Sequence, residues 1–199
     1  MKNRIAPTHG AFARLLLLIT FLLGLALAGP AGAASVRPLG LDEIIDGATT
    51  AFQGTCTENR TELDPQTNMV VTYTTFSVQD VLKGNVQATH TIKQIGGKLP
   101  NNAMNFKVDG IPNFVVGQSY VVFLAGVSAA GFSSPIGLEQ GRFDVRQDKA
   151  GQSVAVGRAP REGGPGASTL LAPGARVPSG RVDLDQFKQA VRARIGSGK

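Results

Sequence analysis

Few side chains beyond the N-terminal segment could take part in acid–base, nucleophilic or metal chemistry. His90 is the one histidine after residue 34, and Cys56 is the one cysteine of the chain. A zinc site needs three or four His, Cys or carboxylate ligands, and neither HExxH nor CxxC occurs. Ser-His-Asp catalysis would need His90 near a serine on a tight turn, and no GxSxG motif occurs. We expect a solvated His90, no metal or other cofactor, and no enzymatic activity.

The acidic side chains between residues 35 and 145 predict solvated charges rather than a catalytic pair. A glycosidase holds two carboxylates about 5–10 Å apart, whereas these acids are scattered and mostly adjoin turn residues. They are Glu58, Glu62, Asp64, Asp80, Asp109, Glu139 and Asp144. The stretch Gly96-Gly97-Lys98 predicts a turn, because it lacks the spaced glycines and the Ser/Thr of a phosphate-binding loop.

The lone thiol predicts a buried and inert side chain. Cys56 lies in the strand-like stretch FQGTCTE, and free cysteine is among the residue types most often buried. A disulfide within the chain is excluded, so a bond between two chains is the alternative. A nucleophilic role would need a base beside the sulfur.

The N-terminus has the three parts of a secretory signal peptide. Basic residues and no acids precede Leu15–Ala28, an apolar run of 14 residues, and the small residues AGAA follow it. Cleavage is expected near Ala33/Ala34. A membrane anchor is the alternative, but the run is shorter than the roughly 20 residues of a span. We expect a secreted or periplasmic protein with no stable membrane span after cleavage.

The net charge of +6 is unevenly distributed along the chain. Residues 35–145 carry seven basic and ten acidic side chains, whereas residues 146–199 carry ten basic and four acidic ones. The predicted folded part therefore lacks a basic surface for nucleic acid. Stacking on bases would need exposed aromatic residues, and the chain has no Trp and two Tyr. We expect no nucleic-acid partner, although the basic residues 176–199 could contact an anionic surface.

Hydrophobic periodicity predicts a mainly β chain with a short helix at 39–48. Strands are predicted at 49–63, 70–82, 89–97, 104–108, 119–127 (central), 134–148 (one strand, or two broken at glycine) and 152–157 (edge). Within 70–82 the apolar face switches between Tyr73 and Phe76, which predicts a bend or bulge. Five or six strands in roughly 110 residues with one long middle connection fit a small barrel or a sandwich, and a strand that bends while it stays paired suits a small closed barrel.

The predicted organisation has four parts. They are a signal peptide at 1–34, a β-barrel domain at 35–156, a flexible Gly/Pro-rich linker at 157–181 and a C-terminal helix at 182–199. Leu184, Phe187, Val191 and Ile195 recur at helical spacing and give this helix a narrow apolar face. The helix either docks on the barrel or binds a partner or an anionic surface.

The order of several sequence blocks resembles a family of uncharacterised secreted bacterial proteins. The blocks are VLKGN, TIKQIGG, VGQSYVVFL and GLEQGRFDV, within residues 41–145. More distantly, the layout resembles the netrin-like module of the tissue inhibitors of metalloproteinases, an OB-type barrel. The resemblance implies a small OB-like (netrin-like) barrel that binds another protein. Those inhibitors grip zinc with an N-terminal cysteine, and this chain has none at its predicted mature start.

Three functional hypotheses follow from these features. The first is an exported, non-enzymatic module that binds another exported protein, specifically by engaging or inhibiting an extracellular or envelope protease. The second is an envelope structural protein whose basic C-terminal tail contacts an anionic polymer or membrane. The third is a hydrolase of unfamiliar type, which would need His90 in a cleft beside a buried acid.

Two irregular segments are the candidate binding surface. One is the connection from residue 98 to residue 117, which is too long for a simple hairpin and offers Lys98, Asn101 and Asn102. The other is the turn Lys83-Gly84-Asn85, which we expect to face the loop at 64–68.

Overall fold

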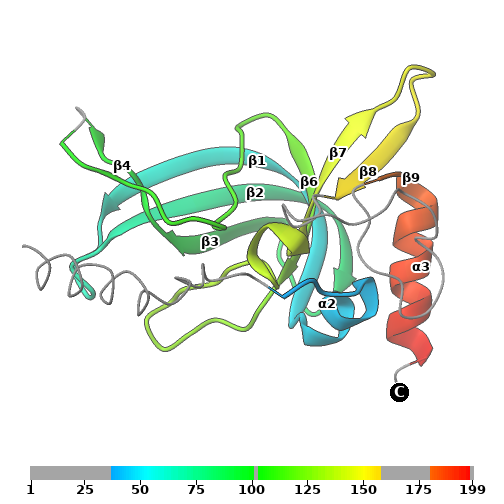
Figure 1. The fold of residues 1–199 in the computed structure, drawn as a ribbon, viewed down its shortest axis with the longest axis horizontal. Helices are drawn as coiled ribbons and strands as arrows, with labels where there is room; N and C mark the ends of the chain where they lie inside the picture. The colour runs from blue at the N-terminus through cyan, green and yellow to red at the C-terminus, as the bar shows by residue number, and fades with distance from the viewer. Residues whose placement is uncertain (1–36, 101–102, 158–179, 198–199) are drawn as a thin grey trace, which may run out of the picture. The chain divides into compact units, whose positions relative to one another are not determined.

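The computed structural model describes residues 37–100, 103–157 and 180–197, which all belong to one compact unit, Val36–Lys199 (Figure 1). The predicted signal peptide and almost all of the predicted linker lie outside the described residues. Within the described ranges, no helix is both long enough and apolar enough to cross a membrane.

The described part of the chain is mainly β, as predicted. Seven of its strands form one antiparallel sheet in the order β3-β2-β1-β6-β7-β8-β9, and β4 pairs with β5. The elements are α2 Leu41–Gly47, β1 Thr50–Leu63, β2 Val70–Lys83, β3 Thr89–Ile95, β4 Gly97–Lys98, β5 Asn105–Phe106, β6 Ser119–Leu124, the 3-10 turn η2 Leu138–Gly141, β7 Arg142–Gln147, β8 Ser153–Gly157, β9 Arg181–Asp183 and α3 Leu184–Ser197.

The sheet is open, so the predicted closure into a barrel is wrong. Strands β3 and β9 lie at its two edges, and no pairing joins these strands in the described part. Strands β7 to β9 extend the sheet beyond β6 instead of curling back toward β3 (Figure 1). Because α2 and α3 cover apolar residues on one face, the sheet buries its core without closing.

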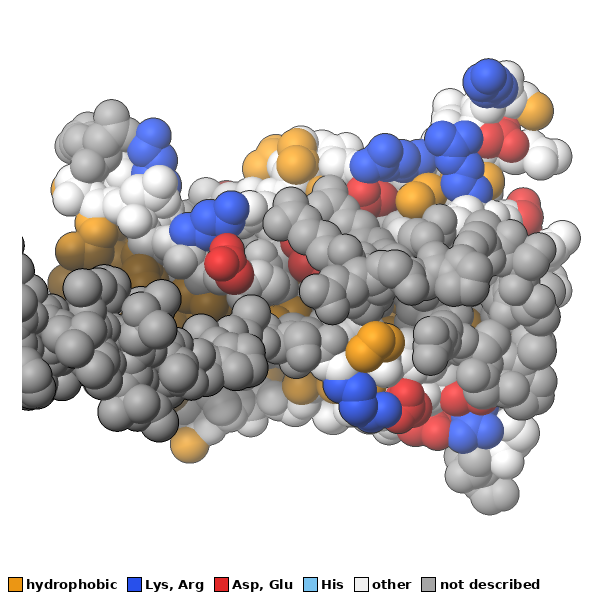
Figure 2. Space-filling view, viewed as in Figure 1, with side chains coloured by type: hydrophobic (Ala, Val, Ile, Leu, Met, Phe, Trp, Pro, Cys, Tyr) orange, Lys and Arg blue, Asp and Glu red, His pale blue; other side chains and the backbone are white. Residues whose placement is uncertain are grey.

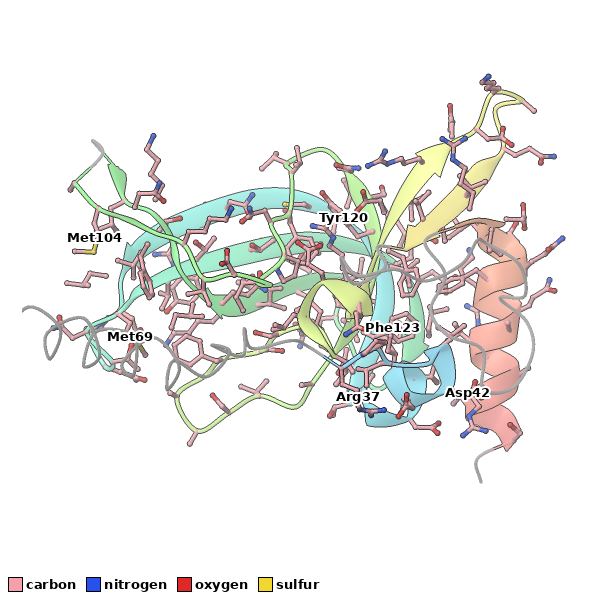
Figure 3. The ribbon with its side chains drawn as sticks, in the orientation of Figure 1. Arg37, Asp42, Met69, Met104, Tyr120 and Phe123 are labelled. Atoms are coloured by element: carbon pink, nitrogen blue, oxygen red, sulfur yellow. The ribbon has the colours of Figure 1, made fainter. Side chains whose placement is uncertain are left out.

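Strand β6 is the central strand, as its continuous apolar run predicts. Val121 and Phe123 belong to a core cluster that α2 and α3 share. Tyr120, Val122 and Leu124 alternate with them and belong to a second cluster on the opposite face. Tyr120 and Phe123 are labelled in Figure 3. Since both faces of β6 are buried, an unbroken apolar run suits this position.

The pairing of the long strands β1 and β2 shifts beside the bend predicted in 70–82, but the extra residue lies on β1. Their register shifts between Cys56 and Glu58, so Thr57 is an extra residue on β1 opposite Thr75 and Phe76. Two further shifts lie near the other end of the pair, between residues 51 and 54. A bulge bends a strand and reverses which of its residues share a face, and this reversal shapes the pocket described below.

The C-terminal helix α3 docks on the sheet, which favours the first of the two predicted arrangements. Leu184, Phe187 and Val191 are buried in the core cluster that includes Phe143 of β7. The ring centroids of Phe143 and Phe187 lie 4.7 Å apart. Strand β9 precedes the helix and pairs with β8, so β8 is not the edge strand that the sequence predicts.

Candidate functional site

A pocket of about 370 Å³ lies between strands β1 to β3 and the described parts of the connection 97–114, which are residues 97–100 and 103–114. Its volume is near the lower end of the range for ligand pockets, about 300–1,000 Å³. The floor is formed by uncharged polar side chains of the three strands: Asn59, Thr61, Thr72, Thr74 and Gln94. The connection supplies apolar side chains and two lysines as the opposite wall: Lys98, Phe106, Lys107, Val108, Ile111, Pro112 and Phe114.

The bulge at Thr57 brings the polar side chains of β1 onto the pocket face. Without an extra residue, Cys56 and Asn59 would lie on opposite faces, because strand residues alternate. With it, both side chains face the same side, and the Asn59 Oδ1 atom lies 3.9 Å from the Cys56 Sγ atom. Thr72 of β2 lies opposite both Thr61 of β1 and Gln94 of β3, which completes a polar row across three strands.

Most hydrogen-bond donors on the pocket floor are already used. The Thr72 hydroxyl donates to the Gly96 carbonyl at 2.7 Å, so the hydroxyl of Thr61, 2.9 Å away, must donate to Thr72. The Thr74 hydroxyl donates to Asn59 Oδ1 at 2.7 Å. The Asn59 amide donates to the carbonyl of Phe114 at 2.7 Å. These bonds hold the floor rigid and leave few protons for a ligand.

Gln94 is the exception on this floor. Its side chain is 3% exposed, and its Nε2 atom has no hydrogen-bond partner among the described residues. A buried donor without a partner costs about 1–3 kcal/mol, so native proteins rarely keep one. Gln94 lines the pocket, but its Nε2 atom has almost no accessible surface. A ligand atom therefore meets this amide only if the side chains around it shift.

The C-terminal half of the connection is fixed to the sheet. Besides the bond from Asn59, the Tyr120 hydroxyl accepts a hydrogen bond from the Val115 amide at 2.8 Å. Arg142, which is 2% exposed, donates to the Asn113 carbonyl. The Arg142 guanidinium also lies 5.6 Å from the centre of the Tyr120 ring. This wall of the pocket is therefore built into the fold.

The N-terminal half of the connection turns sharply at two glycines. Gly96 and Gly97 have φ values of 93° and 136°, which side chains other than glycine rarely adopt. A Cβ atom on Gly97 would lie 2.2 Å from the Thr72 Oγ1 atom, so only glycine fits against the floor. Beyond this corner, the β4–β5 hairpin carries Lys98 at the pocket. Figure 2 shows apolar side chains gathered below this hairpin, at the left of the view.

The predicted contact residues fall at two separate places. Lys98 lines the pocket, whereas Asn101 and Asn102 lie outside the described residues. The turn 83–85 lies near α2, where the Lys83 ammonium donates to the carbonyls of Ile45 and Asp46 at 2.6 and 3.3 Å. Lys83 thus satisfies the C-terminal carbonyl groups of α2, which is a structural role.

The loop at 64–68 does not face the turn 83–85, so this part of the prediction is wrong. Leu63 pairs with Val70 at one end of the β1–β2 pair, and Ala51 pairs with Lys83 at the other end. Both segments connect to β2, a strand of 14 residues, at its opposite ends. They cannot form one surface, because a strand rises about 3.3 Å per residue.

His90 is half-buried, so the predicted solvated histidine is wrong. Its ring lies 5.3 Å from the Phe52 ring, centre to centre, in an edge-to-face contact. Burial lowers the pKa of His90. Among the described residues, its side chain has no hydrogen bond to a carboxylate, which the hydrolase hypothesis requires.

Cys56 is fully buried, as predicted, in the core cluster with Phe52 and Phe76. Burial raises the pKa of its thiol. A raised pKa keeps the sulfur protonated at neutral pH, and a protonated thiol is a poor nucleophile.

Two of the acids predicted to be solvated are buried. Asp64 is 2% exposed and lies 2.9 Å from the Lys93 ammonium. Asp144 is 4% exposed and pairs with Arg142 and Arg146. Periodicity did not reveal these acids, because the cations that neutralise them come from other strands or from two positions away along β7.

Basic side chains of the C-terminal helix α3 form ion pairs within the fold. Arg192 and Lys188 both pair with Asp80 of β2, at 2.6 and 3.3 Å. Arg194 pairs with Asp46 at the end of α2. These pairs give the three cations a role within the fold, and the contact of the basic tail with an anionic surface stays a prediction.

Comparison of the chain with protein-family models, with curated proteins and with solved structures finds no match. The functional assignment therefore rests on the pocket and on the sequence.

Proposed function

We propose that this protein is an exported, non-enzymatic binding module, and that the pocket under the connection 97–114 contacts another exported protein. Export rests on the N-terminal sequence, with its basic region, apolar run and small residues. Binding rests on the pocket between β1–β3 and the connection.

The unpartnered amide of Gln94 is the observation that carries the proposal. Thr72 and Thr74 on the same floor donate hydrogen bonds to protein acceptors, and yet the buried Gln94 amide is left without an acceptor among the described residues. A binding partner that supplies this acceptor would recover the cost of burying the amide. Proteins commonly retain buried polar groups without partners at binding and catalytic sites.

A protease of the envelope or the medium is the first partner to test. The sequence blocks that resemble the netrin-like module support this choice, and they alone support an OB-like origin for the fold. The N-terminal cysteine mechanism of those inhibitors has no counterpart here. An inhibitor of this kind would therefore engage a protease through the pocket rather than through its own first residue.

Selection from a random peptide library tests the binding function. The full chain would be immobilised and a phage-displayed library selected on it. A parallel selection would use Gln94→Met, which removes the donor and keeps the approximate shape. A control variant, Gln147→Met, makes the same change at an exposed position of β7.

We expect enriched peptides that bind the wild type and Gln147→Met and lose at least tenfold affinity on Gln94→Met. Enriched peptides would then be tested as competitors in protease inhibition assays with envelope and medium fractions. Peptides that bind all three proteins equally would contradict the assignment of the pocket as the binding site.

A further inference from the structure

The pocket wall carries positive charge that the described residues do not neutralise. Lys98 and Lys107 both line the pocket, and no carboxylate lines it. Neither lysine has an ion-pair partner in the described part of the chain, whereas cations elsewhere are mostly paired. For example, Arg37 pairs with Glu43 on the exposed surface at 2.7 Å. Two of the cations without an ion-pair partner in the described part of the chain therefore line the pocket.

The side chains of the pocket floor are uncharged, and one of them, Gln94, has a hydrogen-bond donor without a partner among the described residues. The hydroxyl protons of Thr61, Thr72 and Thr74 are committed to bonds within the floor. The Gln94 amide has no hydrogen-bond partner among the described residues, so a ligand atom that reaches it must be an acceptor. Because Lys98 and Lys107 line the same pocket, an anionic oxygen is the acceptor that suits it best.

The apolar side chains of the pocket wall favour a ligand with an apolar group next to its anionic oxygen. Phe106 and Ile111 line the pocket, and Phe106 is 41% exposed. Met104 lies two residues before Phe106 and is 52% exposed. Figure 3 shows Met104 on the hairpin at the same end of the sheet as Met69. Apolar side chains left uncovered beside a polar pocket are typical of a contact surface.

We propose that the pocket binds a carboxylate flanked by an apolar residue, presented by an extended peptide segment. The carboxylate reaches Gln94 and the two lysines, and the apolar neighbour packs on Phe106. This inference rests on the proposed function, since it names the ligand class of the same pocket. The carboxylate can come from an acidic side chain or from a chain terminus, and both supply the same chemistry.

Four probes distinguish the sources of the anion. The first is Ac-Ala-Ala-Phe with a free C-terminus, the second is its C-terminal amide, the third is Ac-Ala-Glu-Phe-amide, and the fourth is inorganic phosphate. Each would be titrated into the full chain labelled with ¹⁵N, and affinity would be read from the amide shifts of residues 94–98 and 105–108.

Charge variants test the role of the two lysines. The double variant Lys98→Gln/Lys107→Gln removes the charge from the pocket wall, and Gln94→Met removes the donor. Lys149→Gln serves as the control, because Lys149 lies in the exposed turn between β7 and β8 and does not line the pocket.

We expect at least one carboxylate peptide to bind at least tenfold more tightly than the neutral amide. This preference should disappear in the double lysine variant and persist in Lys149→Gln. Equal binding of the neutral amide at the pocket overturns the ligand class and leaves the binding function standing. Phosphate that binds as tightly as the peptides overturns the requirement for a carboxylate.

No shift with any peptide also overturns the ligand class. The random selection then separates the two proposals. Pocket-dependent peptides without acidic groups would retain the binding function, whereas no pocket-dependent peptide at all would end both proposals.

Discussion

The free-energy cost of burying a polar side chain on this sheet depends on whether that side chain has a hydrogen-bond partner. Thr74 and Gln94 are both buried on the pocket face. Thr74 donates to Asn59, whereas the Gln94 amide has no partner among the described residues. A side chain kept at a cost to the fold is better explained by binding than by stability.

Replacing Gln94 by Met should therefore not destabilise the protein. We expect the free energy of unfolding to stay the same or to rise by about 1 kcal/mol, because the change removes a buried donor without an acceptor. Thr74→Val is the matched control and should cost about 0.5–1.5 kcal/mol, because it removes a hydrogen bond that is made. Urea unfolding of both variants measures the difference. A larger loss for Gln94→Met would mean that the amide already has a structural partner.

The buried pair of Asp64 and Lys93 predicts sensitivity to acid. Hydrogen bonds from Thr67, together with the Lys93 ammonium, hold the pKa of Asp64 below its usual value. A lowered pKa stabilises the fold at pH values above the pKa of the unfolded chain, about 3.9. That contribution is lost as the pH falls through the lower pKa of the folded protein.

Asp64→Asn should therefore be less stable than the wild type at pH 7 and should lose less stability between about pH 4 and pH 2. Urea unfolding across this range is the measurement, with Asp109→Asn as a control at an exposed acid. Parallel pH curves for Asp64→Asn and the wild type would show that Asp64 does not contribute to acid unfolding.

At the scale of elements, α3 completes one of the two cores. Its buried residues pack with Phe123 and Phe143 on the face of the sheet that α2 also covers. Ion pairs from Lys188 and Arg192 to Asp80 tie it to β2, and an ion pair from Arg194 to Asp46 ties it to the end of α2. A chain truncated at residue 157 would therefore expose core surface and is unsuitable as a binding control.

Phe187→Ala should destabilise the protein by about 3–5 kcal/mol, because Phe187 is 1% exposed and the change leaves a cavity. Gln189→Ala, on the exposed side of the same helix, should change stability by less than about 0.5 kcal/mol. Chemical denaturation followed by circular dichroism compares the two. Equal and small effects would indicate a helix that is not docked in solution.

At the scale of the whole described unit, stability should be highest at the centre of the sheet. Strand β6 is paired on both sides, to β1 and to β7, and buried on both faces. The β4–β5 hairpin is formed by two pairs of residues, and its β5 residues are exposed. Local opening costs least where few apolar contacts and few hydrogen bonds must be broken.

Hydrogen–deuterium exchange should therefore be slowest in β6 and the adjoining half of β1, and fastest in β4, β5 and the β7–β8 turn. Mass spectrometry of peptides from the exchanged protein measures this order. A ligand in the pocket should slow exchange in β4 and β5 more than in β6. Protection of β4 and β5 equal to that of β6 in the free protein would contradict this stability order.

Local sequence patterns were enough to predict most elements of this protein. The predicted apolar run 119–127 contains the central strand, which ends at Leu124. The spacing of Leu184, Phe187 and Val191 correctly predicts the buried face of α3. Cys56 is buried as expected. These features depend on side-chain periodicity and residue type, which are properties of neighbouring residues in the chain.

Tertiary structure alone decided the open sheet, the buried ion pairs and the pocket floor. The polar side chains of Thr72 and Gln94 look solvent-facing in their own strands, because nothing nearby in sequence covers them. They become a pocket floor only when the connection 97–114 folds over them and a bulge at Thr57 turns Asn59 to the same side. Such placements depend on contacts between residues distant in sequence, which local periodicity does not encode.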